Sequence, residues 1–350
     1  MSIDHVTGSL LGAAVGDALG LPYEGLSPRR AVRLLGAPNR FRFVFGWGMV
    51  SDDTEHTCMA AQALLCSDGN VDAFRVQLGR RFRFWLLGLP AGIGLATLRA
   101  ILKLWIGFDP RTSGGFSAGN GPCMRAGILG AAITDGALLR EMVAASSRIT
   151  HTDPKAEYAA LAIALAARLA SEGSIVAGKQ YTSELRSMLP EQAGELISLI
   201  DRAVGAVNEG QSTQEFAEML GLQRGVTGYA YHTAPVVIHA WLANQRDFRS
   251  AVTAVILCGG DADSTASIVG SIVGAGVGKQ GIPSEWIQEI LEWPRSVGWM
   301  ERLGNQLGAF QSSTGKPGPV ELPMFCSIPR NILFMLVVLF HGFRRLFPPY

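Results

Sequence analysis

Apolar residues recur along this chain mainly at helical spacing, and the strict alternation typical of strands is rare. Connections between the periodic segments are short, and no internal repeat separates them. We therefore expect an all-α protein whose main part is one compact helical domain, residues 1–307. The predicted helices span residues 7–21, 54–66, 71–87, 95–105, 121–135, 137–148, 154–171, 183–189, 190–208, 213–220, 235–244 and 247–258.

Glycines recur at every fourth residue in the first helix and in a further helix that follows residue 265. This period places them on nearly one face of each helix. Because each helical glycine costs about 1 kcal/mol relative to alanine, such a stripe indicates that a neighbouring backbone approaches closely. We predict that the two helices pack glycine face to glycine face. The stripes are Gly8, Gly12, Gly16 and Gly20, and Gly270, Gly274 and Gly278.

Two stretches depart from the helical pattern. Residues 22–50 are mixed and predict a short extended segment that caps the core, with Phe41, Phe43, Phe45 and Trp47 alternating. Residues 311–323 are polar and rich in glycine and proline, and nine consecutive apolar residues follow at 332–340. Spanning a bilayer needs about 20 apolar residues. For residues 308–350 we therefore favour a strap and a helix docked on the main domain; a membrane-surface or partner helix is the alternative.

Composition narrows the classes of function. The 350 residues are 48% hydrophobic, which suffices for a core, and the formal net charge is +1. This balance argues against a dedicated nucleic-acid binder. Asp4 and His5 stand where a secretory signal peptide would carry basic residues, so we expect no signal peptide. Scattered cysteines without a CxxC pair indicate reduced thiols in a cytoplasmic protein, rather than disulfides or a zinc site. They are Cys58, Cys66, Cys123, Cys258 and Cys326.

The motif GGDADST is the first candidate for chemistry. It places Asp261 and Asp263 directly after an apolar run, residues 251–257. No lysine or arginine lies between Arg249 and Lys279. Burying two carboxylates there is costly unless a cation meets them, so the motif indicates a bound hard cation.

A second acidic cluster lies in SDDTEHT, where Ser51, Asp52 and Asp53 begin a helix. Taken alone, these residues are more typical of helix capping. Together with the first cluster, however, they offer four carboxylates and two hydroxyls at two helix starts. That set of oxygens suits two Mg²⁺ or Mn²⁺ ions, which can polarise a substrate oxygen and lower the pKa of water.

Four other features are weaker signals. A glycine-rich loop, residues 113–125, runs into a helix and either cradles a phosphate with its N–H groups or is an ordinary flexible loop. Taken alone, His151 reads as a structural histidine and Glu24 is unremarkable. Residues 225–240 either wall a base or ribose pocket or pack in the core.

In combination, these motifs resemble the ADP-ribosylglycohydrolase family. The matching segments, in family order over about residues 6–305, are GSLLGAAVGDALGLPYE, SDDTE, AGNGPCMR, THTDP and GGDADST. The resemblance implies an orthogonal all-α bundle with a binuclear magnesium or manganese centre. It implies metal ligation by Ser51, Asp52, Asp53, Asp261, Asp263 and Ser264.

Further roles follow from the resemblance alone. Asp263 would bridge both ions, and the serines at 51 and 264 replace threonines that are frequent in the family but keep the oxygen ligand. Asp52, Asp53 and Glu24 would be catalytic. Substrate would be bound by Ser117, Gly119, Asn120, Gly121, Met124 and His151.

The implied activity is metal-dependent removal of ADP-ribose from a modified protein or small molecule by attack of water at C1″ of the distal ribose. Arginine N-glycosides are the first expectation, and serine O-glycosides are the enzymatic alternative. A non-catalytic ADP-ribose-binding module is the alternative from another class. We expect a cytoplasmic monomer that releases free ADP-ribose and has no nucleic-acid partner and no transmembrane segment.

Overall fold

A computed structural model describes residues 3–43, 46–310, 320, 322 and 326–347 of the chain. Regular structure in this part is helical, and pairing outside helices is limited to isolated bridges, so the all-α prediction is confirmed. Three short 3₁₀ helices are η1 (Leu21–Tyr23), η3 (Glu191–Ala193) and η4 (Lys279–Gly281). The α-helices of the first half are α1 (Ile3–Gly20), α2 (Pro28–Leu35), α3 (Asp52–Ser67), α4 (Val71–Leu87), α5 (Leu95–Trp105), α6 (Gly121–Met124), α7 (Ala126–Ala132), α8 (Gly136–Arg148) and α9 (Pro154–Ser171).

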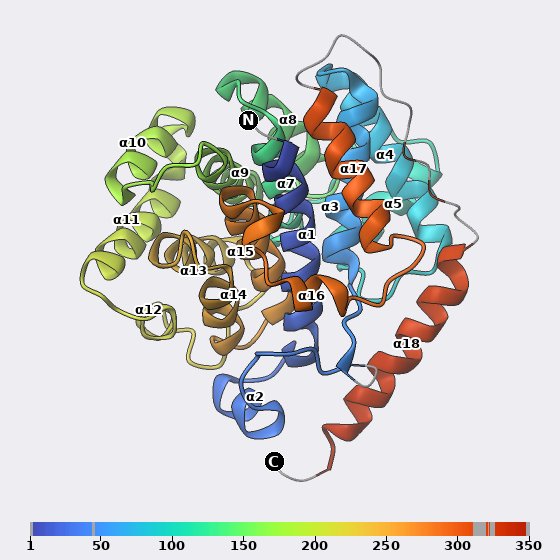
Figure 1. Cartoon of the computed structure of the whole chain (residues 1–350). Coiled ribbons are helices and arrows are strands. Elements are labelled where there is room, and N and C mark those ends of the chain that lie inside the picture. Colours follow the sequence, from blue (N-terminus) through green and yellow to red (C-terminus); the bar gives the residue numbers. More distant parts are fainter. Residues whose placement is uncertain (1–2, 44–45, 311–319, 321, 323–325, 348–350) are drawn as a thin grey trace.

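The second half continues this architecture around the same centre. Figure 1 shows α1 in the middle of the molecule, with α10 and α11 at one edge and α18 at the opposite edge. The helices of this half are α10 (Gly178–Met188), α11 (Gly194–Asn208), α12 (Thr213–Met219), α13 (Ala230–Ala243), α14 (Phe248–Leu257), α15 (Ala262–Val277), α16 (Ser284–Gln288), α17 (Val297–Phe310) and α18 (Ser327–Arg344).

The structure corrects three local predictions. The single helix expected at 121–135 is two helices, because the backbone leaves helical geometry at Arg125, whose buried guanidinium instead donates to the Gly121 carbonyl. Helix α13 begins five residues before the expected start and continues through Pro235, which cannot donate a backbone hydrogen bond. Helices α2, α16 and α17 were not expected, although Ser27 followed by Pro28 at the start of α2 is a typical helix start.

Helices α1 and α15 form the most extensive helix–helix contact among the described residues. They run antiparallel, and a Cβ atom added at Gly12 would lie 2.2 Å from the carbonyl oxygen of Gly270. A Cβ atom at Gly8 would lie 2.3 Å from that of Gly274. The prediction that the glycine faces pack together is therefore confirmed. Toward the other end, Gly16 and Gly20 meet the carbonyls of the small residues Ala266 and Ala262 instead of glycines.

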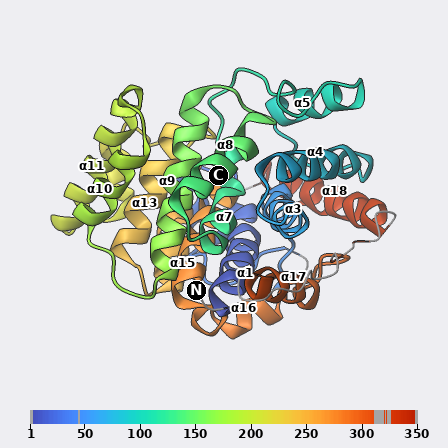
Figure 2. The same cartoon turned by 90° about the horizontal axis from the view of Figure 1, so that it is seen from above.

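The other helices are layered around this pair. Helices α3 and α17 flank α1, whereas α9, α13 and α14 lie against α15. Figure 2 shows the molecule from above, with α4, α5 and α18 at one side and α10 and α11 at the other. The antiparallel packing brings the end of α1 to the start of α15, and α3 starts beside α1. Three segment ends that are far apart in the sequence therefore meet on one side of the core.

Helix α18 contacts the rest of the chain at both of its ends. Asn331 donates to the Gly88 carbonyl, and His341 lies 3.0 Å from the Pro22 carbonyl. Phe334 is buried with Phe43. The division of the chain at residue 307 stays a prediction, and residue 45 and most of the expected strap lie outside the described residues. Among the helices described, none has both the length and the apolar character needed to cross a membrane.

We predict that Gly12→Ala lowers the free energy of unfolding by about 3 kcal/mol, because the new methyl group would meet a backbone carbonyl that cannot move away. Urea unfolding measures this change. Gly205→Ala in α11 is the matched control, since a Cβ atom there has nothing within 4 Å. That variant should gain about 0.5–1 kcal/mol. Equal effects of the two substitutions would contradict close packing of α1 on α15.

Candidate active site

A cavity of about 520 Å³ opens where the starts of α3, α6 and α15 converge. All but one of the thirteen candidate site residues line it, and the exception, Ser51, is hydrogen-bonded to one that does. The lining candidates are Glu24, Asp52, Asp53, Ser117, Gly119, Asn120, Gly121, Met124, His151, Asp261, Asp263 and Ser264. The structure thus brings both acidic clusters and the glycine-rich loop to one place; the role of each residue stays a prediction.

The two acidic clusters meet at the carboxylate of Asp53. Its Oδ2 accepts a hydrogen bond from Ser51 Oγ at 3.1 Å and one from Ser264 Oγ at 3.2 Å. Ser51 also caps α3 by accepting the Asp53 N–H, so capping and site formation coexist here. At α15, by contrast, the side chain of Asp261 makes no capping hydrogen bond, although it occupies the N-cap position.

Asp17 is a buried acid that we did not expect at this site. It projects from α1, and its Oδ2 accepts the N–H of Ser51 at 2.8 Å and that of Thr54 at 3.2 Å. The Thr54 hydroxyl donates to the same oxygen at 2.5 Å. Asp17 thereby fixes the start of α3 on α1. The available signal was a carboxylate among the small and apolar residues in the second half of the helix.

The electrostatics of the cavity are those of crowded, buried acids. Burial raises the pKa of Asp52, Asp53 and Asp263 well above the usual range, and neighbouring carboxylates raise it further. Burial also raises the pKa of Asp261 and of Glu24, the latter also through the charge of Asp261. Without a cation, these groups therefore favour their protonated forms at a higher pH than ordinary carboxylates.

The donor set fits a hard cation. One carboxylate oxygen in each of Asp17, Asp53 and Asp263 is buried without a hydrogen-bond partner. Such oxygens are costly unless something positive meets them. Within the described residues, no group of three side chains from histidine, cysteine, aspartate or glutamate lies close enough together to hold a metal ion as it stands. The chemistry of the set, carboxylates and hydroxyls, is that of magnesium and manganese ligands.

The glycine-rich loop forms another part of the cavity wall, in contact with the acids. Asn120 Nδ2 donates to Asp261 Oδ2 at 2.6 Å and to Thr233 Oγ1 at 3.0 Å, so this loop is tied to the acidic cluster. Its backbone N–H donates to the Gly228 carbonyl, which brings residues 226–228 into the wall of the cavity. The segment at 225–240 thus contributes to the wall at its start and packs in the core further on.

His151 packs under the same loop. Cβ atoms added at Gly119 or Gly121 would lie 3.0 and 2.9 Å from its ring, which explains why both positions are glycine. Burial and the charge of Arg125 lower the pKa of His151 to about 3, so the ring is neutral at physiological pH. Arg125 is itself buried and donates to Thr150 Oγ1 at 2.7 Å and to the Gly121 carbonyl at 2.8 Å, which joins loop and histidine.

Two arginines of the C-terminal helix support the acidic segments from outside. Arg330 forms a buried ion pair with Glu292 and donates to the carbonyl of Val50, the residue before Ser51. Arg345 donates to the backbone carbonyl of Glu24 at 2.7 Å. Sequence reasoning missed both arginines, because neither is near a motif in the chain.

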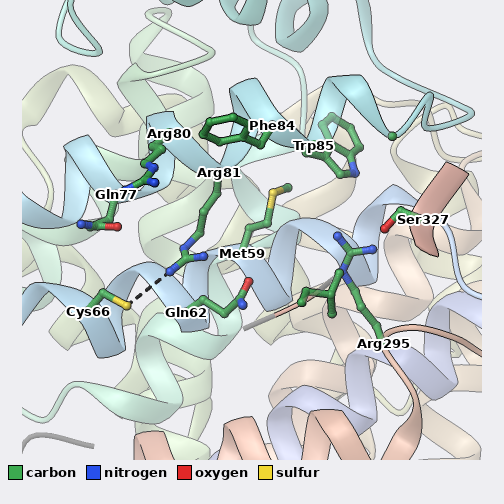
Figure 3. A pocket seen from close by; sticks show the side chains of 12 residues that line it. Met59, Gln62, Cys66, Gln77, Arg80, Arg81, Phe84, Trp85, Arg295 and Ser327 are labelled. Atoms are coloured by element: carbon green, nitrogen blue, oxygen red, sulfur yellow. Dashed lines mark hydrogen bonds between the residues drawn. The ribbon is translucent and has the colours of Figure 1, made fainter. Parts of the chain in front are cut away.

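A second cavity, of about 460 Å³, lies between α3 and α4 (Figure 3). Arginines 80, 81 and 295 line it, and Arg81 points toward Cys66, to which it donates a hydrogen bond of 3.3 Å. Among the described residues, no acid lines this cavity. It therefore lacks the carboxylate chemistry of the first.

The amino-acid sequence matches the ADP-ribosylglycohydrolase family over residues 2–316. The chain belongs to the ADP-ribosylglycohydrolase family. This confirms the resemblance seen in the motifs and makes the protein an enzyme, an ADP-ribosyl hydrolase, rather than a binding module without catalysis. The family is metal-dependent, in agreement with the donor set described above.

Relatives of this ADP-ribosylglycohydrolase are diverse. It is 28% identical to the ADP-ribosyl-dinitrogen reductase glycohydrolase of Rhodospirillum rubrum, over 82% of this chain and 90% of the relative. It is 29% identical to the ADP-ribosylarginine hydrolase Tri1 of Pseudomonas putida (87% and 78%) and 25% identical to the ADP-ribosylhydrolase ARH3 of Gallus gallus (80% and 87%). A solved structure titled ADP-ribosylglycohydrolase-related protein complex aligns with a TM-score of 0.60 and 25% identity, over 88% of this chain and 98% of that one.

We predict that the metal-free enzyme gains stability relative to its Asp17→Asn variant as the pH falls from about 7 to about 5. The comparison is needed because buried histidines, whose pKa is lowered, change stability in the opposite direction over this range. Burial raises the pKa of Asp17 to about 6 from an ordinary 3.8. The folded protein therefore takes up a proton in this range that the unfolded chain does not hold, and protonation favours folding. Thermal unfolding in chelator measures the trend, and saturating Mg²⁺ should weaken it, since the metal competes with protons. A stability difference from the Asp17→Asn variant that stays constant or reverses over this range would contradict the buried acidic cluster.

We predict that Arg330→Met lowers the free energy of unfolding by about 3–5 kcal/mol, because it leaves Glu292 buried without its cation. Arg344→Ala, which removes an exposed arginine from the same helix, should change it by less than about 0.5 kcal/mol. Urea unfolding of both variants checks the difference. Similar small effects would show that the Arg330–Glu292 pair does not hold α18 in place.

Proposed function

We propose that this enzyme hydrolyses the N-glycosidic bond between ADP-ribose and an arginine side chain, with water attacking C1″ of the distal ribose. The observation that carries the proposal is the convergence of two acidic helix starts and the Asn120 loop on one cavity. The family acts on ADP-ribosylated proteins and releases ADP-ribose. Here the products would be free ADP-ribose and the unmodified arginine.

The parts of the cavity have distinct roles in this proposal. The backbone around Asn120 holds the diphosphate, and His151, being neutral and buried, fixes the shape of that loop. Asp52 or Asp53 accepts the proton of the attacking water. Glu24 lines the same cavity, where it would respond to the substrate.

Two metal ions, Mg²⁺ or Mn²⁺, are the proposed cofactors. Ser51, Asp52 and Asp53 would hold them from α3, and Asp261, Asp263 and Ser264 from the start of α15, with Asp263 shared. When bound, such ions orient the ribose hydroxyls and stabilise charge at the reacting centre. The unpartnered oxygens of Asp53 and Asp263 support this assignment.

Arginine is favoured as the acceptor by the charge of the cavity. Five acids line it, and no lysine or arginine does so among the described residues. A guanidinium leaving group would be attracted to such a wall, whereas a serine hydroxyl would gain nothing from it. The relative from Pseudomonas putida, which is 29% identical to this chain, carries the name ADP-ribosylarginine hydrolase.

Incubation with arginine-linked and serine-linked ADP-ribosyl peptides tests the linkage, with Mg²⁺, Mn²⁺ or chelator present and released ADP-ribose as the readout. We expect ADP-ribose to be released from the arginine-linked peptide, and chelator should abolish this release. Release from the serine peptide alone would assign the enzyme to the other linkage.

We also propose a cytoplasmic monomer; the unpaired state of all five cysteines agrees with a reducing compartment.

We predict that Asp263→Ala lowers hydrolysis by more than about 100-fold, because this buried carboxylate would be shared by both ions. Calorimetric titration with Mn²⁺ should show weaker binding in parallel. Glu141→Ala, which removes an exposed acid of α8, is the control and should leave both quantities unchanged. Full Mg²⁺-dependent activity in the Asp263 variant would refute the assignment.

A further inference from the structure

Helix α18 buries polar side chains and exposes apolar ones, which is the reverse of an ordinary surface helix. Its buried side chains include the polar residues Arg330, Asn331 and His341, which bind the rest of the chain. A surface helix normally buries its apolar stripe and leaves polar residues in solvent. In α18 only Phe334 among the large apolar side chains is fully buried.

The outer face of α18 and of the residues just after it is therefore apolar. Phe340 is 75% exposed, and its neighbours on this face are similarly open. Helix α18 runs along the edge of the molecule in both views (Figures 1 and 2). We call these residues the α18 outer face: Leu336, Leu339, Phe340, Phe343, Leu346 and Phe347.

The groove beside the α18 outer face is lined by arginines and, among the described residues, by no acid. This groove of about 710 Å³ joins this face to residues 40–43, and Arg40, Arg42 and Arg344 line it together with Leu336 and Phe340. Apart from Arg330, which is buried and paired with Glu292, seven arginines occur in segments 25–50 and 326–350 combined, and neither segment contains an aspartate or a glutamate. Apolar side chains bordered by arginines match the interfacial layer of an anionic bilayer, where phosphates lie above acyl chains.

We propose that the α18 outer face lies on an anionic membrane surface, with its phenylalanines and leucines inserted among the lipids and the arginines paired with phosphate. A second copy of the chain fits less well, because a symmetric contact would place the arginines of one copy against those of the other. The contacts of Arg330 and Arg345 keep the helix on the protein, so binding needs no unfolding of the domain.

Co-sedimentation of the full-length protein with vesicles tests this proposal. We expect binding to vesicles that contain phosphatidylglycerol, weaker binding to pure phosphatidylcholine, and a loss of binding as salt is raised. The double substitution Phe340→Glu with Phe343→Glu should weaken partitioning by more than about tenfold. Arg344→Ala should weaken it by about fivefold for the loss of one surface charge.

Ile175→Glu is the matched control, since Ile175 is also exposed but lies between α9 and α10, across the molecule from α18. It should bind vesicles like the unchanged protein. Circular dichroism and hydrolysis of a soluble peptide should be unchanged in the Phe340/Phe343 variant, which separates lost docking from lost folding. The proposal would be overturned if neither kind of vesicle bound the protein, or if all variants bound equally. It would also be overturned if sedimentation velocity showed a dimer that depends on Phe340 while vesicles did not bind.

Discussion

The backbone contact between α1 and α15 is the constraint on which the site depends. Glycine at positions 8, 12, 270 and 274 lets carbonyl groups approach where a methyl group would collide. Because the helices are antiparallel, this contact fixes the end of α1, with Glu24 beyond it, against the start of α15, with Asp261 and Asp263. The placement of half of the acidic cavity follows from a packing rule and not from the acids themselves.

The other half of the cavity depends on Asp17. Its carboxylate accepts the free N–H groups at the start of α3 and so anchors Ser51 and Asp53 to α1. The fold thereby concentrates acids that repel one another and that burial keeps from ionising at their usual pH. A cation removes that conflict, since it gives the buried oxygens a partner. Stability and metal-dependent catalysis are linked through the same carboxylates.

The family match ends at residue 316, before α18 begins. This helix nevertheless reaches both acidic segments, through Arg330 to Val50 and through Arg345 to Glu24. Its polar residues serve these inner contacts, so its apolar residues are left facing outward. The two properties of the helix, a brace for the site and an apolar outer face, have one physical origin.

The sequence alone determined the helical class, most helix bounds, the glycine contact and the candidate residues that gather in the cavity, because periodicity, helix starts and motif order are local properties of a chain. It did not reveal Asp17, Arg330 or Arg345, whose partners are tens to hundreds of residues away in the sequence. It also left the orientation of α18 open, since nine consecutive apolar residues do not say which side faces the protein. Only tertiary structure decides this, because burial and charge pairing arise when distant segments meet.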